Sequence, residues 1–275
     1  MENPFILTAL GLIIGTFGTL IGAGGGFILV PILILFFPQF PPEITTAISI
    51  AVVAINSISG SFAYAKSGRI DYKAGTTFAL FTIPGSILGV LTVQYIPQKS
   101  FNILFGILLI MLSAYLFSKN KDVVSKTVKF CNLKGYKNTS LKDKKGTLYE
   151  YSYKQSNGII ISVFVGFISP LLGIGGGIIH VPAMVNWLGF PVHIATATSH
   201  FILAVMATVS VITHAISGSY NDSETITTIL YLCIGVIPGA QLGAYFSHRI
   251  KSHVIIKLLA FCLIIVGIRI LSKSF

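Results

Sequence analysis

The chain has 275 residues, of which 53% are hydrophobic and only 10% are charged. A soluble domain carries about 25% charged residues, so this composition excludes an ordinary soluble protein and indicates an integral membrane protein. The net charge of +11 does not predict nucleic-acid binding, because more than half of the basic residues lie in one polar segment, 119–154. A basic loop of this kind is typical of the cytoplasmic face of a membrane protein, beside anionic lipid.

Apolar runs follow one another along most of the chain, at 5–37, 44–66, 74–96, 99–118, 159–188, 194–217, 224–247 and 252–272. Most of them are close to the ~20 residues that a spanning helix needs. The first and the fifth run are longer, and each is interrupted by a cluster of glycines. The sequence therefore predicts an all-α polytopic membrane protein.

The two glycine clusters lie in matching segments, GTFGTLIGAGGGFILVP at 15–31 and GFISPLLGIGGGIIHVP at 166–182. Each glycine inside a helix costs about 1 kcal/mol relative to alanine, so two matched clusters indicate a duplicated chain and a functional role for the break. We therefore divide the chain into a transmembrane repeat at 1–118, a lysine-rich cytoplasmic linker at 119–157 and a second transmembrane repeat at 158–275.

The distribution of basic residues predicts how the two repeats are oriented. The loop at 66–73 is mainly basic, whereas its counterpart at 217–224 has only acidic charges. Between the last two runs the second repeat instead carries Arg249 and Lys251. This reversal favours two inverted-topology repeats, each made of a glycine-broken segment (a hairpin or a discontinuous helix) plus three transmembrane helices. The linker then lies in the cytoplasm and both termini lie outside.

A plain bundle of eight spans with parallel halves is the alternative topology. It would place the basic loop at 249–251 outside, which the distribution of positive charge in membrane proteins disfavours. Within the linker, the alternation of residues from Gly146 to Ser156 favours a short β-hairpin.

Each glycine cluster is followed by a new apolar run, which begins at Phe27 in the first repeat and at Ile178 in the second. If these are helix starts, each offers unpaired backbone N–H groups and the positive end of a helix dipole to an anion. Close packing of helices on small residues is the alternative explanation for the glycines. Three consecutive glycines before a new apolar run, occurring twice, exceed what packing requires.

The positions of the charges predict the sign of the ligand. All acidic residues fall in loops or at the ends of runs, so no central carboxylate is available for a cation. Polar residues inside the runs are the natural additional ligands. The predicted substrate-binding residues are Gly24, Gly25, Gly26, Gly175, Gly176, Gly177, Ser49, Ser199, His200, Asn56 and Gln241.

Two histidines inside apolar runs, His180 and His200, have no histidine at the matching positions of the first repeat. They are candidates for proton coupling, with hydrogen-bonded core histidines as the alternative. The three cysteines, Cys131, Cys233 and Cys262, lack the spacing of metal ligands, so neither a metal site nor a cofactor is predicted.

The paired G-x-G-G-G…V-P segments, the succession of apolar runs and the A-T-x-T-S-H stretch at Ala195–His200 resemble the sulfite exporter TauE/SafE family. The resemblance implies a multi-pass protein of the cytoplasmic membrane that exports a sulfur-containing anion, such as sulfite, an organosulfonate or a related oxyanion. Its implied partners are this small anionic substrate and the lipid bilayer. A homo-oligomer is also compatible with the sequence.

The function hypothesis is a secondary transporter that binds the anion between the two glycine-broken segments. A passive anion channel on the same duplicated scaffold is the alternative. An intramembrane enzyme is disfavoured, because the chain has no H-E-x-x-H or G-x-S-x-G motif and no paired carboxylates at depth. A scaffold that recruits acidic partners through the linker is a further alternative.

Overall fold

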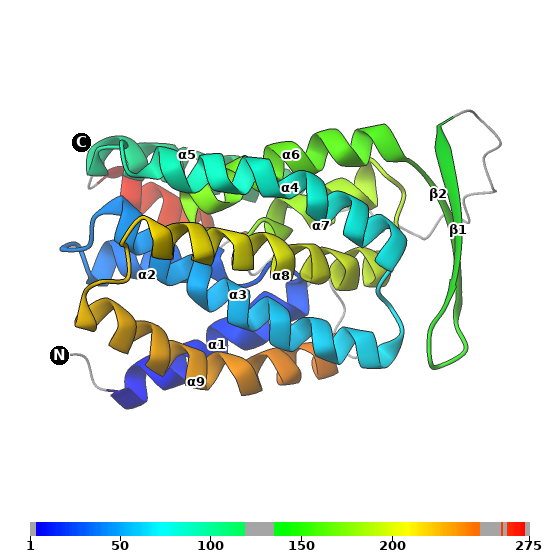
Figure 1. The fold of residues 1–275 in the computed structure, drawn as a ribbon, viewed down its shortest axis with the longest axis horizontal. Coiled ribbons are helices and arrows are strands. Elements are labelled where there is room, and N and C mark those ends of the chain that lie inside the picture. Colours follow the sequence, from blue (N-terminus) through cyan, green and yellow to red (C-terminus); the bar gives the residue numbers. More distant parts are fainter. Residues whose placement is uncertain (1–3, 119–134, 248–259, 261–262, 273–275) are drawn as a thin grey trace.

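The computed structural model describes residues 4–118, 135–247, 260 and 263–272. The described chain is mostly helical (Figure 1). The labelled helices are α1 (Pro4–Ile21), α2 (Gly26–Phe36), α3 (Pro42–Ser67), α4 (Tyr72–Val93), α5 (Gln98–Ser118), α6 (Gln155–Leu172), α7 (Gly177–Asn186), α8 (Val192–Ile216) and α9 (Ser223–Phe246). A shorter apolar helix, Leu263–Ser272, lies in the last apolar run. The rest of that run, with Arg249 and Lys251, falls outside the described residues.

Seven helices of the described chain are long and apolar enough to cross a membrane: α1, α3, α4, α5, α6, α8 and α9. The helices α2 and α7, with 11 and 10 residues, are too short to do so. Both of the short helices directly follow a glycine cluster. The predicted polytopic membrane protein with two interrupted segments is therefore confirmed.

Backbone conformation explains why each long apolar run is interrupted where it is. Gly22 and Gly24 adopt φ angles of 81° and 79°, and Gly173 and Gly175 adopt 67° and 68°. Glycine takes this left-handed region freely, whereas other residues pay a steric penalty there. The chain can therefore leave one helix and start the next within four or five residues.

The aspartates of two matching loops cap the helices that follow them. Asp71 Oδ1 accepts a hydrogen bond of 3.0 Å from Ala74 N at the start of α4. Asp222 Oδ2 accepts one of 3.2 Å from Thr225 N at the start of α9. Such N-caps typically contribute about 1 kcal/mol. These two acidic residues thus have a local structural role at the ends of spans.

The first helix of each repeat packs against a later helix of the other repeat, and glycines permit the contact. Helix α1 runs parallel to α9, with Gly11 beside Leu232 and Gly15 beside Val236. Helix α6 runs parallel to α4 in the same way, since Gly85 lies beside Val163 and Gly89 beside Phe167. A Cβ atom on Gly89 would lie 2.5 Å from the Phe167 carbonyl oxygen, so only glycine allows this approach.

Helices α3 and α8 pack against each other in the middle of the molecule (Figure 1). They are antiparallel, because Gly60 near the end of α3 contacts His200 near the start of α8. At the other end of the pair, Tyr220 just after α8 donates a hydrogen bond of 3.1 Å to the Ala47 carbonyl oxygen near the start of α3. The two repeats therefore share one central helix pair.

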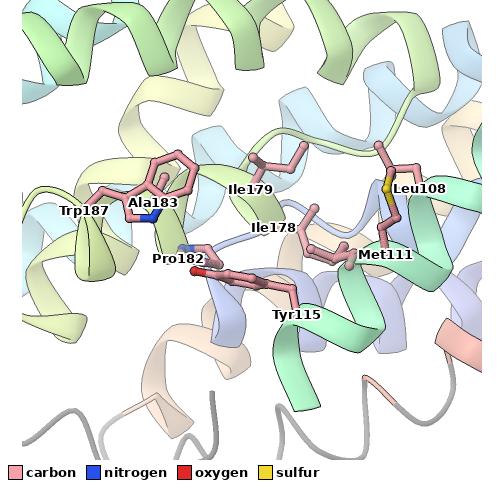
Figure 2. Close-up of a pocket in the computed structure, with 9 residues that line it drawn as sticks. Leu108, Met111, Tyr115, Ile178, Ile179, Pro182, Ala183 and Trp187 are labelled. Carbon is pink, nitrogen blue, oxygen red and sulfur yellow. The ribbon is translucent and has the colours of Figure 1, made fainter. Parts of the chain in front are cut away.

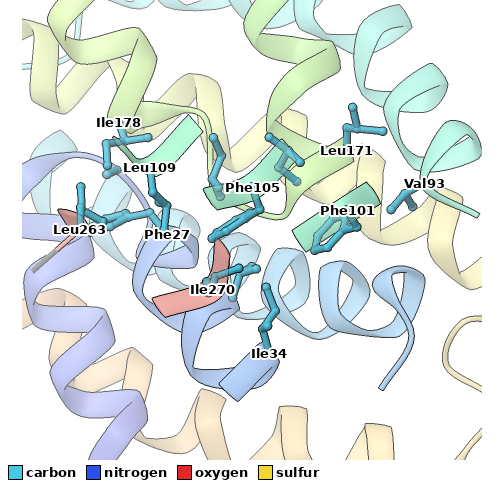
Figure 3. Close-up of a cluster of buried hydrophobic side chains, with 14 residues drawn as sticks. Phe27, Ile34, Val93, Phe101, Phe105, Leu109, Leu171, Ile178, Leu263 and Ile270 are labelled. Carbon is cyan, nitrogen blue, oxygen red and sulfur yellow. The ribbon is translucent and has the colours of Figure 1, made fainter. Parts of the chain in front are cut away.

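One hydrophobic cluster joins both short helices to the surrounding spans (Figure 3). Phe27 of α2 and Ile178 of α7 belong to it, as do Phe101 and Phe105 of α5. Ile270 of the last helix also packs there. The starts of α2 and α7 are thus held in a common apolar core.

The linker departs from the all-α prediction, because its described part forms a β-hairpin. The strands β1 (Tyr136–Lys142) and β2 (Leu148–Lys154) pair antiparallel. The hairpin starts ten residues before Gly146, so the predicted range covered only its turn and second strand. Figure 1 shows it across one end of the bundle, which we call the hairpin end. The opposite end, with the loops 37–41 and 217–222, is called the distal end.

Two polar contacts and an aromatic cluster hold the hairpin on the bundle. Arg69 forms an ion pair with Asp143, with 3.6 Å between Arg69 Nε and Asp143 Oδ2. Tyr151 donates a hydrogen bond of 2.6 Å to Asp71 Oδ2. Tyr151 and Tyr153 also pack against Phe190, with ring centroids 4.6 Å and 4.9 Å away. Residues of the linker therefore bridge the α3–α4 loop and the loop before α8.

Ionisation of Asp143 supports this docking. Burial opposes the ionised carboxylate, but hydrogen bonds from the Thr147 and Lys145 backbone N–H groups and the charge of Arg69 outweigh it and lower the pKa of Asp143. Burial raises the pKa of Tyr153 to about 12, so this tyrosine stays neutral at physiological pH.

Candidate functional site

The two glycine clusters touch each other directly and reciprocally. Gly26, where α2 begins, lies against the carbonyl oxygen of Gly173 and against Ile174. Gly177, where α7 begins, lies against the carbonyl oxygen of Gly22 and against Ala23. A Cβ atom on either Gly26 or Gly177 would overlap the opposite backbone, which explains why both positions are glycine. The structure therefore brings the two predicted glycine clusters into contact.

Ser49 and Ser199 occupy matching positions around this contact. Ser49 Oγ of α3 donates a hydrogen bond of 2.6 Å to Gly173 O. Ser199 Oγ of α8 donates one of 3.4 Å to Gly22 O. Each serine therefore bonds the glycine cluster of the other repeat. Both hydroxyl protons are committed to these carbonyl groups in the present conformation.

Several backbone N–H groups at the contact are buried and have no partner among the described residues. In the first cluster they belong to Gly25, Gly26 and Phe27, because the first helical bonds of α2 come from the two residues that follow. In the second cluster they belong to Gly175, Gly176, Gly177 and Ile178. A buried N–H without a partner costs about 1–3 kcal/mol, and two helix starts add positive dipole ends. An anion would accept hydrogen bonds from these N–H groups, and its negative charge would be stabilised by the positive ends of the two helix dipoles.

A buried chain of polar groups extends from the first cluster to His200. Asn56 Nδ2 donates a hydrogen bond of 2.8 Å to Gly24 O, and Thr19 Oγ1 donates one of 2.9 Å to Asn56 Oδ1. His200 Nε2 lies 3.2 Å from Thr19 Oγ1. Since the threonine proton goes to Asn56, Nε2 carries the proton of the neutral ring. The buried Nδ1 has no hydrogen-bond partner among the described residues, and it becomes a donor only when the ring is protonated.

Two further hydroxyl groups at the clusters were not among the predicted site residues. Ser57 Oγ and Ser169 Oγ are buried and have no hydrogen-bond partner among the described residues. A Cβ atom on Gly24 would lie 3.4 Å from Ser57 Oγ, and one on Gly176 would lie 3.3 Å from Ser169 Oγ. For Ser169 the available signal was a polar residue within one or two turns of a glycine cluster, which also applies to Thr19, whereas Ser57 of α3 is distant from both clusters in the sequence.

Two of the predicted residues lie elsewhere. Gln241 Nε2 donates to Ser59 O at 2.8 Å and to Ser59 Oγ at 2.9 Å, and so joins α9 to α3. His180 Nε2 lies 3.3 Å from Ser162 Oγ, and its ring meets that of Phe78 edge-on. The side-chain hydrogen bonds of both residues are made with residues outside the glycine clusters.

A separate cavity of about 230 Å³ lies between α5 and α7 (Figure 2). Its lining is Leu108, Met111, Leu112, Tyr115, Ile178, Ile179, Pro182, Ala183 and Trp187. This lining is almost wholly apolar, and Asn186 Nδ2 donates a hydrogen bond of 2.9 Å to the Tyr115 hydroxyl. The Tyr115 hydroxyl and the Trp187 indole N–H are few donors for an anion, so the glycine clusters are the better candidate site.

The described residues contain no group of three or more His, Cys, Asp or Glu side chains that could hold a metal ion. The chemistry of the site therefore rests on backbone N–H groups, hydroxyl groups, one amide and one imidazole. These groups can bind and orient an oxyanion through hydrogen bonds.

Comparison with known proteins gives the same assignment as the motifs. The family model described as sulfite exporter TauE/SafE matches residues 7–270. A probable membrane transporter protein of Bacillus subtilis (strain 168), YunE, is 35% identical over 279 residues, which cover 98% of this chain and 97% of that protein. A probable membrane transporter protein of Methanocaldococcus jannaschii is 29% identical over 256 residues, covering 90% of this chain and 87% of that protein.

The sulfite exporter TauE/SafE family protein 6 of Arabidopsis thaliana is 25% identical over 114 residues, which cover 42% of this chain and 26% of that protein. No solved structure gives a significant match. Because the family model spans nearly the whole chain and includes both glycine clusters, this multi-pass membrane protein belongs to the sulfite exporter TauE/SafE family.

Proposed function

We propose that this protein is a secondary transporter of the cytoplasmic membrane that exports a small sulfur-containing anion, such as sulfite, an organosulfonate or a related oxyanion. The observation that carries the proposal is the meeting of two helix starts, both with unpartnered buried N–H groups, inside an apolar bundle. Irregular backbone at membrane depth normally lines a cavity or a ligand site. The membership in a transporter family is in agreement with it.

The anion binds at the two glycine clusters in this proposal. The N–H groups from Gly25 to Phe27 and from Gly175 to Ile178 supply most of the donors. Ser57 and Ser169 contribute hydroxyl donors, and Ser49 and Ser199 do so when their bonds to the opposite carbonyl groups open. The donors belong to both glycine clusters. A ligand that bonds to both must therefore have several acceptor atoms, as an oxyanion has.

Transport follows from movement of two inverted repeats against each other. Support comes from the helix directions: α1 is parallel to α9, α6 is parallel to α4, and α3 is antiparallel to α8. If each repeat is a pair of one long and one short helix (α1 with α2, α6 with α7) followed by three spans, matching helices of the two repeats run in opposite directions. The hairpin end then faces the cytoplasm, in agreement with the basic linker.

The direct contact of the clusters supports a carrier over an open channel. Gly177 lies against Gly22 O, so an anion between these atoms requires the clusters to separate. We assign the present conformation to a closed state, in which the two clusters are in contact. Separation of the two clusters would break the bonds of Ser49 and Ser199 to the opposite carbonyl groups. The N–H and hydroxyl donors would then be accessible from one side of the membrane at a time.

Counterflow in proteoliposomes tests the proposal. Vesicles with purified protein are loaded with unlabelled sulfite, and uptake of external ³⁵S-sulfite is measured, with methanesulfonate and chloride as competitors. Protein-free vesicles correct for permeation of the neutral acid form. We expect saturable counterflow that methanesulfonate reduces and chloride does not.

Gly26→Ala and Gly177→Ala should abolish this counterflow, because the added methyl group prevents the two clusters from meeting. Gly146→Ala is the matched control, since nothing lies within 4 Å of a Cβ atom at this position. Uptake that grows linearly with concentration and lacks counterflow would establish the channel instead. Absence of any sulfite or sulfonate flux in the wild type would overturn the proposed substrate class.

A further inference from the structure

A second cluster of polar side chains lies at the distal end and joins the two repeats. Glu43 stands in the first turn of α3, His214 in the last turn of α8 and Ser219 in the loop that follows. Ser219 Oγ donates a hydrogen bond of 2.6 Å to Glu43 Oε1. His214 Nδ1 lies 3.1 Å from the same Ser219 Oγ. The serine hydroxyl therefore connects a carboxylate to an imidazole.

The three side chains differ in their access to solvent. Glu43 is partly exposed, Ser219 is 3% exposed and His214 is completely buried. The second ring nitrogen of His214, Nε2, is buried and has no hydrogen-bond partner among the described residues. One end of the cluster thus meets the surface, and the other end is an unpartnered nitrogen in the protein interior.

The hydrogen bonds determine where the protons are. The single proton of Ser219 points to the Glu43 carboxylate, so the serine oxygen accepts a bond from His214 Nδ1–H. Nε2 of the neutral ring then carries a lone pair. The three side chains therefore form a short chain of hydrogen bonds in which donors and acceptors can exchange roles when a proton passes along it.

Neighbouring groups hold this chain in place without competing for the proton. Tyr220 donates to Ala47 O and keeps the loop on α3, and burial raises the pKa of its hydroxyl, which therefore stays neutral. From α9, Asp222 is engaged with Thr225 as an N-cap and Glu224 is exposed to solvent. Among the described residues, Glu43 is the carboxylate that reaches His214.

We propose that Glu43, Ser219 and His214 form a proton relay that couples anion transport to the proton gradient. A proton that arrives at His214 Nε2 from the interior forms a new N–H bond. The Nδ1 proton then moves to Ser219 Oγ, and the serine proton moves to Glu43 Oε1. The carboxylic acid finally releases its proton to solvent. One proton enters and one leaves, and the same steps reversed carry a proton inward.

This relay differs from the candidates His180 and His200. Those two rings contact the hydroxyl groups of Ser162 and Thr19, and none of the hydrogen bonds of either ring reaches a carboxylate. A protonated imidazole inside a membrane is stabilised by a nearby negative charge, and among these three described histidines His214 is the one whose hydrogen-bonded cluster includes a carboxylate. The inference rests on the proposed transport function and specifies its coupling ion.

The test separates anion exchange from proton-driven accumulation. Proteoliposomes with wild-type protein are assayed for ³⁵S-sulfite exchange at equal pH on both sides, and for net accumulation under a gradient of one pH unit with the voltage clamped. A pH-sensitive dye inside the vesicles records proton movement. With one proton per anion, the gradient supports up to roughly tenfold accumulation.

His214→Gln, Glu43→Gln and Ser219→Ala are compared with the exposed controls His193→Gln and Glu224→Gln. We expect the three relay variants to lose the gradient-driven accumulation and the dye signal, while saturable exchange shows that they are folded. The two controls should behave as the wild type.

The outcomes distinguish the relay from the transport proposal. Wild-type exchange without any effect of the pH gradient would overturn the relay alone. Relay variants that accumulate sulfite as the wild type does would have the same consequence. Absence of exchange in the wild type would overturn the transport proposal, and with it the relay that depends on it.

Discussion

Ser49 and Gly173 are joined by a hydrogen bond of 2.6 Å from the serine hydroxyl to the glycine carbonyl oxygen, although 124 residues separate them in the chain. Ser199 and Gly22 form the matching bond in the other direction. Each of the two long central helices is thereby tied to the glycine cluster of the opposite repeat.

Ser49→Ala should lower the free energy of unfolding by about 1–3 kcal/mol, because it removes the donor of a buried carbonyl group. Ser199→Ala should cost less, since its bond of 3.4 Å is longer. Thermal unfolding in detergent measures both. Thr208→Ala is the control, because this exposed hydroxyl bonds only its own helix. Equal stability of Ser49→Ala and the control would contradict the assigned role of the bond.

Gly25→Ala should destabilise the protein more than Gly176→Ala. Gly25 has a φ angle of 89°, where a residue with a Cβ atom costs roughly 1–2 kcal/mol, whereas Gly176 has an ordinary φ of −46°. Gly146→Ala is matched in strain, with φ at 87°, but has open space around it. We expect Gly25→Ala to lower the free energy of unfolding more than Gly146→Ala does, because its Cβ atom would also meet Ile14. A reversed order would show that backbone strain does not limit this cluster.

Asn56→Asp should abolish sulfite counterflow. The change replaces the amide that donates to Gly24 O with a carboxylate, which repels that carbonyl oxygen and any bound anion. Asn157→Asp, in the exposed first turn of α6, introduces the same charge at a place where helices favour it. The experiment compares counterflow of the two variants in proteoliposomes. Full activity of Asn56→Asp would place the anion away from this network.

The docking of the hairpin should weaken at acidic pH. The pKa of Asp143 is lower in the folded protein than its ordinary value of about 3.9, so its ionisation contributes stability above that pH. This contribution is lost as the pH falls through the folded-state pKa. Hydrogen exchange of 136–154, corrected for the intrinsic rate, should therefore show less protection at pH 3 than at pH 5.

In Asp143→Asn, the hydrogen-exchange protection of 136–154 should already be low at pH 5, because the asparagine side chain is neutral at both pH values. Glu150→Gln, which changes an exposed carboxylate on the same hairpin, should behave as the wild type. Protection in the wild type that does not change between the two pH values would refute the role of Asp143.

The broken segments were predictable because their signal is local. Three consecutive glycines inside an apolar run disfavour a continuous helix wherever they occur, and the duplication repeated the signal. The register of Ser49 and Ser199 also came from the repeat. By contrast, Gln241 could not be placed by spacing, because its hydrogen bonds to Ser59 depend on how α9 packs on α3.

Thr19 and Ser169 were missed for a related reason. A single hydroxyl in an apolar run most often bonds its own helix, as Thr208 does, so a position next to a glycine cluster is only a weak reason to select it. The relay of Glu43, Ser219 and His214 joins residues from both repeats, and the hairpin bonds Asp71 through Tyr151. Neither pairing has a signal along the chain.

The sequence by itself determined the membrane class, the two matching glycine-rich segments, the interruptions they cause and the absence of carboxylates from the centres of the apolar runs. These properties follow from composition and from the free-energy cost of glycine in a helix. Both depend only on residues within one helical turn or one span. Only the tertiary structure decided that the two clusters touch, which serine bonds which carbonyl group, and which histidine reaches a carboxylate. Those relationships depend on the antiparallel packing of α3 on α8, and on the parallel packing of α1 on α9 and of α6 on α4, which bring together side chains that are distant in sequence.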